Sequence, residues 1–220
     1  MVSLLRLPPL LRAGKGLGRR MMVVAAALLG YLIGSLPTAN ALARLWGVNL
    51  LTSGSGNPGA NNARRVGGLA LSLSVLIVEV GKGMLAVVIG MSLAGDLGAV
   101  AAGVGAAAGN VYNVWYSFRG GKGLAIALGV LVAAWPTVVP LVLVILGVAA
   151  AFTRSTGIGA LVTLVSLFVA ALTWGWIGLG PAWGVADVTT LLVLGVGIPS
   201  ILWRRHWADA MARLRAPAPL

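Results

Sequence analysis

The sequence has no cysteine, a single histidine and only four acidic residues among its 220 positions. Without cysteine there can be no disulfide framework, thiolate nucleophile, iron–sulfur cluster or cysteine-type zinc site. So few carboxylates and imidazoles leave little for a carboxylate metal cage. We therefore expect neither a metal site nor a cofactor in this protein.

Charge is scarce as well, because only 9% of the residues are charged, against roughly 25% in soluble globular domains. Apolar residues make up 59% of the chain, and the formal net charge is +12. A chain of this length cannot keep so much apolar surface from water, which excludes an ordinary soluble domain. The segments are solidly apolar, without the alternation of a β-barrel. The sequence therefore predicts an all-α polytopic membrane protein.

Six segments carry few or no charges, and a helix needs about 20 such residues to cross the bilayer core. They are residues 22–43, 69–93, 97–117, 123–153, 155–186 and 188–203. As one helix, 123–153 would be about 46 Å long, and Pro136 and Pro140 near its middle each remove a helix hydrogen bond. We predict a hairpin of 124–135 and 137–152, which gives about seven transmembrane helices. Gly30 with Gly34, and Gly105 with Gly109, predict close helix packing.

Basic residues favour the cytoplasmic side of a membrane. A seven-helix layout with the first loop inside and a six-helix layout with the amino terminus inside give the same basic-residue count, so both stay open on charge. Only the seven-helix layout gathers every polar motif on one face. It predicts a multi-pass protein of the cell (inner) membrane with its site on the cytoplasmic face.

The basic amino-terminal tail, residues 1–20, conflicts with that layout. We hypothesise that translation begins at Met21 or Met22 and that the tail is a start-site extension; a signal peptide is the alternative. The expected organisation is therefore the tail (1–20), a seven-helix membrane domain (21–207) and a basic cytoplasmic tail (208–220).

A loop rich in glycine, amide and arginine follows the first helix. Glycines allow the backbone to approach an anion closely, and successive amides can form an anion-binding nest. Arginine forks suit phosphate. The match to G-x-G-x-x-G is no dinucleotide fingerprint, because no βαβ unit surrounds it. We favour an anion site over a flexible polar linker. The residues concerned are Gly54, Ser55, Gly56, Asn57, Gly59, Asn62, Arg64 and Arg65.

A second loop places two cations among three glycines at the start of an apolar segment, where a helix amino terminus favours an anion. It lacks the upstream glycine and the Ser or Thr of a P-loop, and a positive-inside anchor is an equal alternative. Its residues are Arg119, Gly120, Gly121, Lys122 and Gly123.

Three further ionisable residues stand out. Glu79 and Lys82 are three apart in an apolar segment, so they share a helix face and can pair. Ionised groups within a span mark function by default, although a structural pair is the alternative and is favoured for Glu79. His206 is the only histidine, and histidine is the side chain whose unperturbed pKa lies near neutrality; a membrane-surface anchor is its alternative. No G-x-S-x-G serine elbow accompanies it.

Together these motifs resemble the bacterial acyl-phosphate:glycerol-3-phosphate acyltransferases of the PlsY type. That family shows G-S-G-N-x-G-A-x-N followed by Arg, then F-K-G-G-K-G, then R-H-R-E-N, and the counterparts here are residues 54–65, 118–123 and 205–209. The resemblance implies transfer of a fatty acyl group from acyl phosphate to the 1-hydroxyl of glycerol 3-phosphate, giving lysophosphatidic acid and phosphate. The implied partners are these substrates and the lipid bilayer, with no nucleic acid and no obligate protein partner.

By resemblance the catalytic residues are Ser55, Arg65 and His206. The implied substrate-binding residues are Gly54, Gly56, Asn57, Gly59, Asn62, Lys82, Arg119, Gly120, Gly121, Lys122 and Gly123. The chain departs from the family pattern at Asn49, Leu51, Asn61, Asn110, Gly157 and Asp209. An inactive paralogue and a transporter of an anionic solute stay open as alternatives, although no second copy of loop 54–65 suggests the repeats of a transporter.

Overall fold

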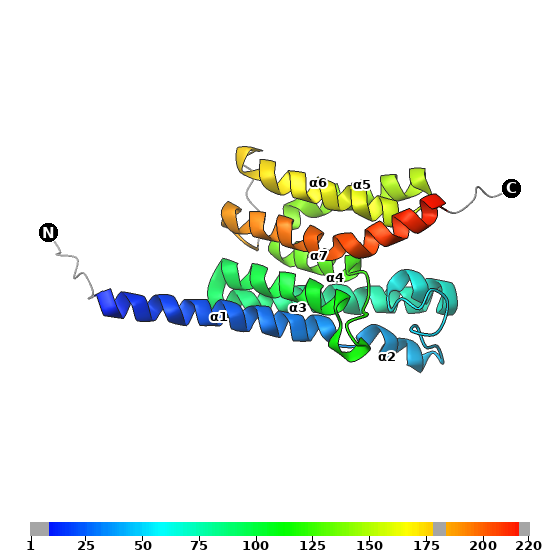
Figure 1. Ribbon diagram of the computed structural model, residues 1–220, viewed down its shortest axis with the longest axis horizontal. Coiled ribbons are helices and arrows are strands. Elements are labelled where there is room, and N and C mark those ends of the chain that lie inside the picture. Colours follow the sequence, from blue (N-terminus) through cyan, green and yellow to red (C-terminus); the bar gives the residue numbers. More distant parts are fainter. Residues whose placement is uncertain (1–8, 178–183, 216–220) are drawn as a thin grey trace.

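The computed structural model describes residues 9–177 and 184–215, and every regular element in these ranges is a helix. The helices lie along one long axis, with the start of α1 at one end and α2 and the carboxyl end of α7 at the other (Figure 1). This arrangement confirms the all-α fold. In chain order the elements are α1 (Pro9–Ser35), α2 (Thr38–Leu45), α3 (Ala60–Val111), η1 (Val114–Tyr116), α4 (Leu124–Ala134), η2 (Pro136–Val138), α5 (Val139–Thr153), α6 (Thr156–Ile177) and α7 (Val188–Arg215).

Helix α3 contains a hairpin of two antiparallel limbs, preceded by a short first segment that ends where the backbone leaves helical geometry at Gly68. Its backbone leaves helical geometry at Ala94 and at Gly95, whose φ of 64° is the left-handed conformation that glycine adopts without steric cost. A Cβ on Gly90 would collide with the carbonyl of Gly98, and the reverse also holds. The two limbs therefore pack with their backbones in contact, as small residues allow in lipid.

The two predicted glycine pairs pack α1 against the second limb of α3. Gly30 lies against the backbone of Ala102, and Gly34 lies against the backbone of Ala106. Gly105 and Gly109 make the reciprocal contacts with backbone atoms of α1. The prediction of close packing at these positions is confirmed.

Five stretches are long and apolar enough to cross a membrane: Gly16–Leu45, Ala60–Tyr116, Pro136–Thr153, Thr156–Trp174 and Val188–Arg215. The second contains both limbs of α3, and α4 is a shorter apolar helix. The hairpin predicted for 123–153 is confirmed, since α4 ends at Ala134 and α5 begins at Val139. The total of seven crossings stays a prediction, as do the three-part organisation and the start site.

Four segment boundaries were wrong. The first helix begins at Pro9 instead of residue 22, and the second limb of α3 ends at Val111 instead of residue 117. The segment 22–43 is not one helix, because the chain breaks at Leu36–Pro37 between α1 and α2. Proline has no backbone N–H and fixes φ, so it ends a helix readily. The last helix continues twelve residues past Trp203, to Arg215. The predicted break at 178–181 lies outside the described residues.

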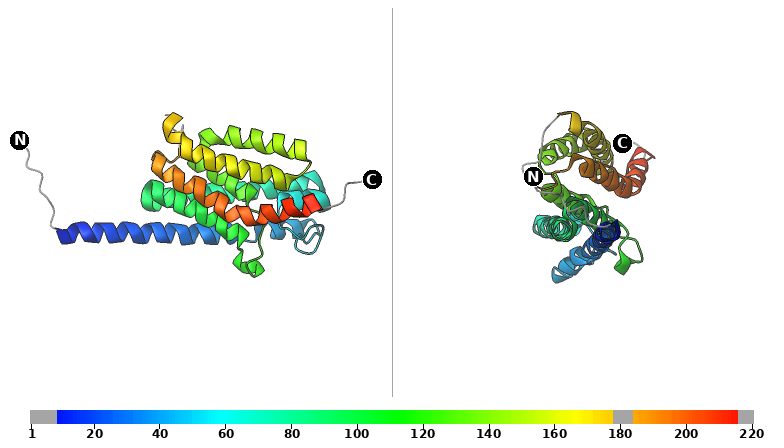
Figure 2. Two further views of the ribbon diagram at one scale, coloured as in Figure 1. Left: turned by 45° about the horizontal axis from the view of Figure 1, so that its top comes forward. Right: turned by 90° about the vertical axis from the view of Figure 1, so that its left-hand side faces the viewer.

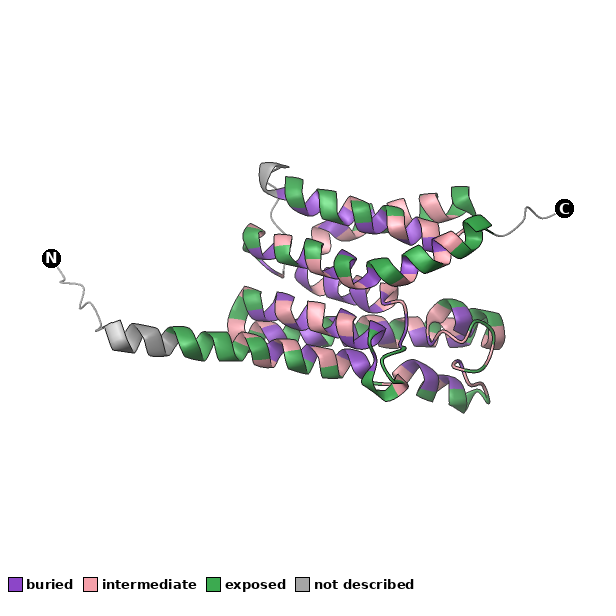
Figure 3. Cartoon of the chain, in the orientation of Figure 1, coloured by how far each residue is buried: buried purple, intermediate pink, exposed green. Residues whose placement is uncertain are grey.

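The bundle has two halves. Seen end-on, α5, α6 and α7 form one group and α1 to α4 form the other (Figure 2), and α3 contacts α7 between them. Buried residues line the facing sides of the helices, while many outer positions are exposed (Figure 3). At the end opposite α2, Asp187 caps α7 by accepting hydrogen bonds from the backbone of Thr189 and from Thr190. The Thr190 hydroxyl holds the pKa of Asp187 below its usual range.

Candidate active site

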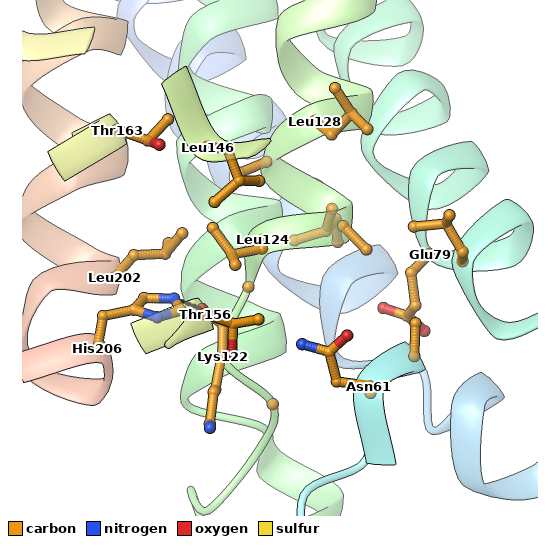
Figure 4. A pocket seen from close by; sticks show the side chains of 18 of the residues that line it. Asn61, Glu79, Lys122, Leu124, Leu128, Leu146, Thr156, Thr163, Leu202 and His206 are labelled. Atoms are coloured by element: carbon orange, nitrogen blue, oxygen red, sulfur yellow. Dashed lines mark hydrogen bonds between the residues drawn. The ribbon is translucent and has the colours of Figure 1, made fainter. Parts of the chain in front are cut away.

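A cavity of about 430 Å³ lies between the two halves, where the two polar loops meet the helix ends. Figure 4 shows Asn61, Lys122, Thr156 and His206 at its polar end, with Leu128, Leu146 and Leu202 beyond them. The amino-terminal residues of both α3 and α4 are part of the wall, and helix amino termini favour anions. The polar residues in the lining are Ser55, Asn57, Asn61, Asn62, Arg65, Glu79, Asn110, Lys122, Thr156, Thr163, His206 and Asp209.

Asn62 pins the first polar loop. Its Oδ1 accepts a hydrogen bond from the backbone N of Ser55 at 2.8 Å. Its Nδ2 donates to the carbonyls of Leu50 at 3.1 Å and Ser53 at 2.9 Å. Asn62 is buried, and its three bonds hold the Ser55 segment against the start of α3. Gly54, with φ of 62°, supplies the turn that this closure needs.

The second polar loop lies flat on the carboxyl end of α3. Gly120 N donates to the Val111 carbonyl at 3.0 Å, and Gly121 N donates to the Asn110 carbonyl at 2.9 Å. A Cβ on Gly120 would collide with that Asn110 carbonyl, so the contact requires glycine. The loop then turns at Gly123, whose φ is 82°, into α4. This path presents Lys122 to the cavity.

Glu79 and Lys82 form a buried cluster on α3, in the half of the bundle formed by α1 to α4. Lys82 Nζ lies 3.0 Å from Glu79 Oε1, and it also donates to the Leu36 carbonyl at 2.8 Å. Glu79 accepts from Thr38 Oγ1 at 2.8 Å and from Asn110 Nδ2 at 2.7 Å. The cluster therefore ties the break between α1 and α2 to both limbs of α3, and every charge in it is matched.

His206 and Asp209 lie on α7, in the half of the bundle formed by α5, α6 and α7, and line the cavity from there. His206 is 1% exposed, and its Nε2 lies 3.2 Å from the Lys122 carbonyl oxygen. Its Nδ1 is buried and has no hydrogen-bond partner among the described residues. Asp209 is three residues further along, on the same helix face, and its Oδ2 accepts a hydrogen bond from Lys122 Nζ in an ion pair.

The family model described as glycerol-3-phosphate acyltransferase matches residues 24–216. The chain belongs to the glycerol-3-phosphate acyltransferase family. The acyltransferase of Bradyrhizobium diazoefficiens is 38% identical over 179 residues, covering 80% of this chain and 88% of its own. That of Symbiobacterium thermophilum is 33% identical over 204 residues, covering 88% and 92%. The resemblance carried by the motifs is thereby confirmed.

Solved structures of the family agree with the fold. A crystal structure of PlsY (YgiH), an integral membrane glycerol 3-phosphate acyltransferase in its glycerol 3-phosphate form, matches with a TM-score of 0.72 and 27% identity over 87% of this chain and 91% of that one. The lysophosphatidic acid form matches with a TM-score of 0.69 and 25% identity over the same shares. Family and fold together support an integral membrane acyltransferase of phospholipid synthesis rather than an anion transporter.

Most residues implied by the family resemblance lie on the cavity wall. Ser55 and Arg65 are exposed at its mouth, while His206 is buried beside Lys122. These residues are far apart in the sequence, but α3 and α7 bring them to the same end of the bundle. The implied residues in the lining are Ser55, Asn57, Gly59, Asn62, Arg65, Gly121, Lys122, Gly123 and His206.

Five implied substrate-binding residues are not in the lining. Lys82 is buried against Glu79, so its charge is already paired within the protein. Gly54 and Gly56 have φ of 62° and 69° and shape the first loop. Gly120 supports the second loop from beneath, and Arg119 is exposed outside the lining. Direct substrate contact by these five residues stays a prediction, while their positions suit loop support or surface charge.

Asn61, Glu79, Asn110 and Asp209 line the cavity without having been predicted to bind substrate. Three of them were noted as departures from the family pattern, and Glu79 was favoured as structural. A signal was available for Asp209, because its i+3 spacing from His206 places both on one helix face. For Asn110 the signal was an amide inside an apolar segment.

Proposed function

We propose that this protein transfers a fatty acyl group from an acyl phosphate to the 1-hydroxyl of glycerol 3-phosphate, at the cytoplasmic face of the cell (inner) membrane. The observation that carries the proposal is the division of one cavity into a cationic, glycine-bounded mouth and an apolar interior. A phosphorylated head group fits the first part and a hydrocarbon chain fits the second. Family membership supports glycerol 3-phosphate as the acceptor.

The apolar interior extends inward from the polar mouth, between helices of both halves. From Gly123 to Leu131 on α4, and from His206 to Ile198 on α7, the lining extends for about 12 Å at 1.5 Å per residue. Residues of α5 and α6 complete it, among them Leu146 and Leu164. An acyl tail lying here places its carboxyl end beside Lys122 and His206.

The reaction needs no covalent enzyme intermediate. The hydroxyl oxygen of glycerol 3-phosphate attacks the carbonyl carbon of the mixed anhydride, the ester C–O bond forms, and the bond from that carbon to the phosphate oxygen breaks. Phosphate leaves with the electron pair, and the hydroxyl proton passes to a phosphate oxygen of the donor. The leaving group is good, so positioning and charge stabilisation are the main contributions required of the protein.

Each part of the mouth has a proposed role in this step. Ser55 and the loop amides hold the reacting centre, and Arg65 and Lys122 bind phosphate oxygens by charge-assisted hydrogen bonds. His206 binds or orients one substrate. Asn62 positions the Ser55 segment through its three hydrogen bonds rather than by touching substrate.

Purified protein in detergent is offered glycerol 3-phosphate with palmitoyl phosphate or, in parallel, with palmitoyl-CoA. We expect lysophosphatidic acid from the acyl phosphate alone. Ser55→Ala should lower the turnover sharply; unchanged turnover would remove Ser55 from the mechanism. Product from palmitoyl-CoA alone, or none from either donor with folded protein, would overturn the proposed donor.

The natural lack of cysteine makes the orientation directly testable. Arg119→Cys reports on the end that carries the cavity, and Thr189→Cys reports on the opposite end. In intact cells a membrane-impermeant maleimide should label the second and leave the first unlabelled until the membrane is opened. The reverse pattern would place the site on the outer face.

A further inference from the structure

Lys122 and Asp209 form an ion pair at the mouth of the cavity. The lysine comes from the loop before α4 and the aspartate from the last turns of α7, and both line the cavity. Their side chains are 33% and 34% exposed, so the pair is open to solvent and to ligands entering from the mouth. Among the described residues, the Asp209 carboxylate has no further hydrogen-bond or ion-pair partner.

Gly157 on α6 makes room for this aspartate. A Cβ built on Gly157 would lie 2.8 Å from the Cβ of Asp209 and 3.2 Å from the backbone N of Ala210. Real Cβ atoms essentially never approach another heavy atom so closely as the first distance. The start of α6 can therefore close on α7 with Asp209 facing Lys122 because residue 157 has no side chain.

The second carboxylate in the lining behaves differently. Glu79 is buried and already receives hydrogen bonds from Lys82, Thr38 and Asn110. Asp209 instead holds one partner, and that partner is the lysine best placed to receive a phosphate. A carboxylate and a phosphate present the same kind of anionic oxygen to an ammonium group. An entering phosphate and Asp209 must therefore compete for Lys122.

We propose that Asp209 occupies Lys122 in the free protein and gives it up to the phosphate of the substrate. Asp209 thus sets the affinity of the site for phosphate and acts as a specificity-determining, positioning residue. A neutral ligand such as glycerol gains nothing from Lys122 and leaves the pair in place, whereas a phosphate dianion displaces the carboxylate. This inference rests on the proposed function, in which Lys122 binds phosphate.

Asp209→Asn tests the competition with little change of shape. We expect KM for glycerol 3-phosphate and the dissociation constant for inorganic phosphate to fall about two- to fivefold, the scale of a partly exposed ion pair. The gain should appear in KM rather than in kcat, because the pair is already broken in the bound complex. Asp96→Asn, at the opposite end of the bundle, removes the same charge and should change neither constant.

Inorganic phosphate binding is measured by calorimetry on the full chain in detergent without any acyl donor. If no lysophosphatidic acid forms but Asp209→Asn still binds phosphate more tightly, the proposed function fails and the competition stands. If phosphate binding is unchanged or weaker in Asp209→Asn, the inference is overturned. A fall in kcat with unchanged KM also overturns it, since Asp209 would then act in the chemical step.

Discussion

Two lysine–carboxylate pairs lie at the same site, and they differ in burial and in the number of their partners. Lys82 and Glu79 have side chains that are 7% and 4% exposed, and Thr38 and Asn110 complete the hydrogen bonds of the carboxylate. The side chains of Lys122 and Asp209 are about one third exposed, and among the described residues their charged groups have only each other as partners. The first pair leaves no group free for a ligand, and the second leaves a cation that a ligand can take over.

Burial and the number of partners, rather than the residue types, therefore decide what a charged pair contributes. A buried charge without its partner is costly because it has lost water and gained nothing. A half-exposed pair is worth little to stability, since water replaces either partner. We therefore assign Lys82–Glu79 to the fold and Lys122–Asp209 to ligand affinity.

Lys82→Met removes the cation of the buried pair and should have the largest effect, on the stability of the fold. Glu79 would remain buried without a cation, which costs about 3–5 kcal/mol of folding free energy. Thermal unfolding in detergent should show a large fall in midpoint and a smaller monodisperse fraction. Adding Glu79→Leu to Lys82→Met removes the stranded charge and should recover part of the loss. A single variant as stable as the parent would contradict the assignment.

Lys122→Met removes the cation of the exposed pair and should affect ligand binding rather than stability. Stability should change by less than about 1 kcal/mol, because the pair is half exposed. Binding of inorganic phosphate should weaken about 10- to 100-fold, the worth of a hydrogen bond to a charged group. Lys122→Arg keeps the charge and should lose less. If Lys122→Met instead destabilises the protein as strongly as Lys82→Met, the two pairs are not different in kind.

Asn110→Leu removes one hydrogen-bond partner of Glu79 while leaving Lys82 in place. The hydrogen bond from Asn110 Nδ2 to Glu79 Oε2, at 2.7 Å, is to a buried charge, so its loss should cost about 1.5 kcal/mol. Asn61→Leu is the matched control, since Asn61 is an exposed amide in the same cavity. Equal unfolding midpoints for the two variants would mean that Asn110 contributes nothing to the buried cluster.

Sequence patterns predicted those parts of the fold that depend on local properties. The hairpin at Pro136 followed from a run too long for one crossing, and the packing of α1 on α3 followed from glycines four residues apart. The break at Pro37 was missed because the segments were divided by charge, and no charged residue lies between residues 22 and 43. The extension of α7 beyond Trp203 was missed because its apolar run ends there, although Ala, Leu, Met and Arg all favour helix.

The candidate site was predictable as two loops but not as a set of partners. The chemistry of the two loops predicted anion binding by the segments of Ser55 and Lys122, and the family resemblance added His206. All three line one cavity. The partners of Glu79 and Lys122 include Asn110 and Asp209, which are 31 and 87 positions away. The spacing of Glu79 and Lys82 predicted their pairing, but the contacts with Asn110 and Asp209 depend on the packing of whole helices and follow from no local pattern.

Gly157→Ala has the smallest expected effect and tests the exposed pair without touching either charge. The new Cβ would stand 2.8 Å from that of Asp209, so α6 and α7 must separate or the carboxylate must turn from Lys122. Inorganic phosphate should then bind up to about twofold more tightly, a part of the gain expected for Asp209→Asn. Gly81→Ala, where an added Cβ meets nothing within 4 Å, is the control. Because both changes act on one contact, Gly157→Ala should add nothing to Asp209→Asn; an additive gain would show that Gly157 affects phosphate by another route.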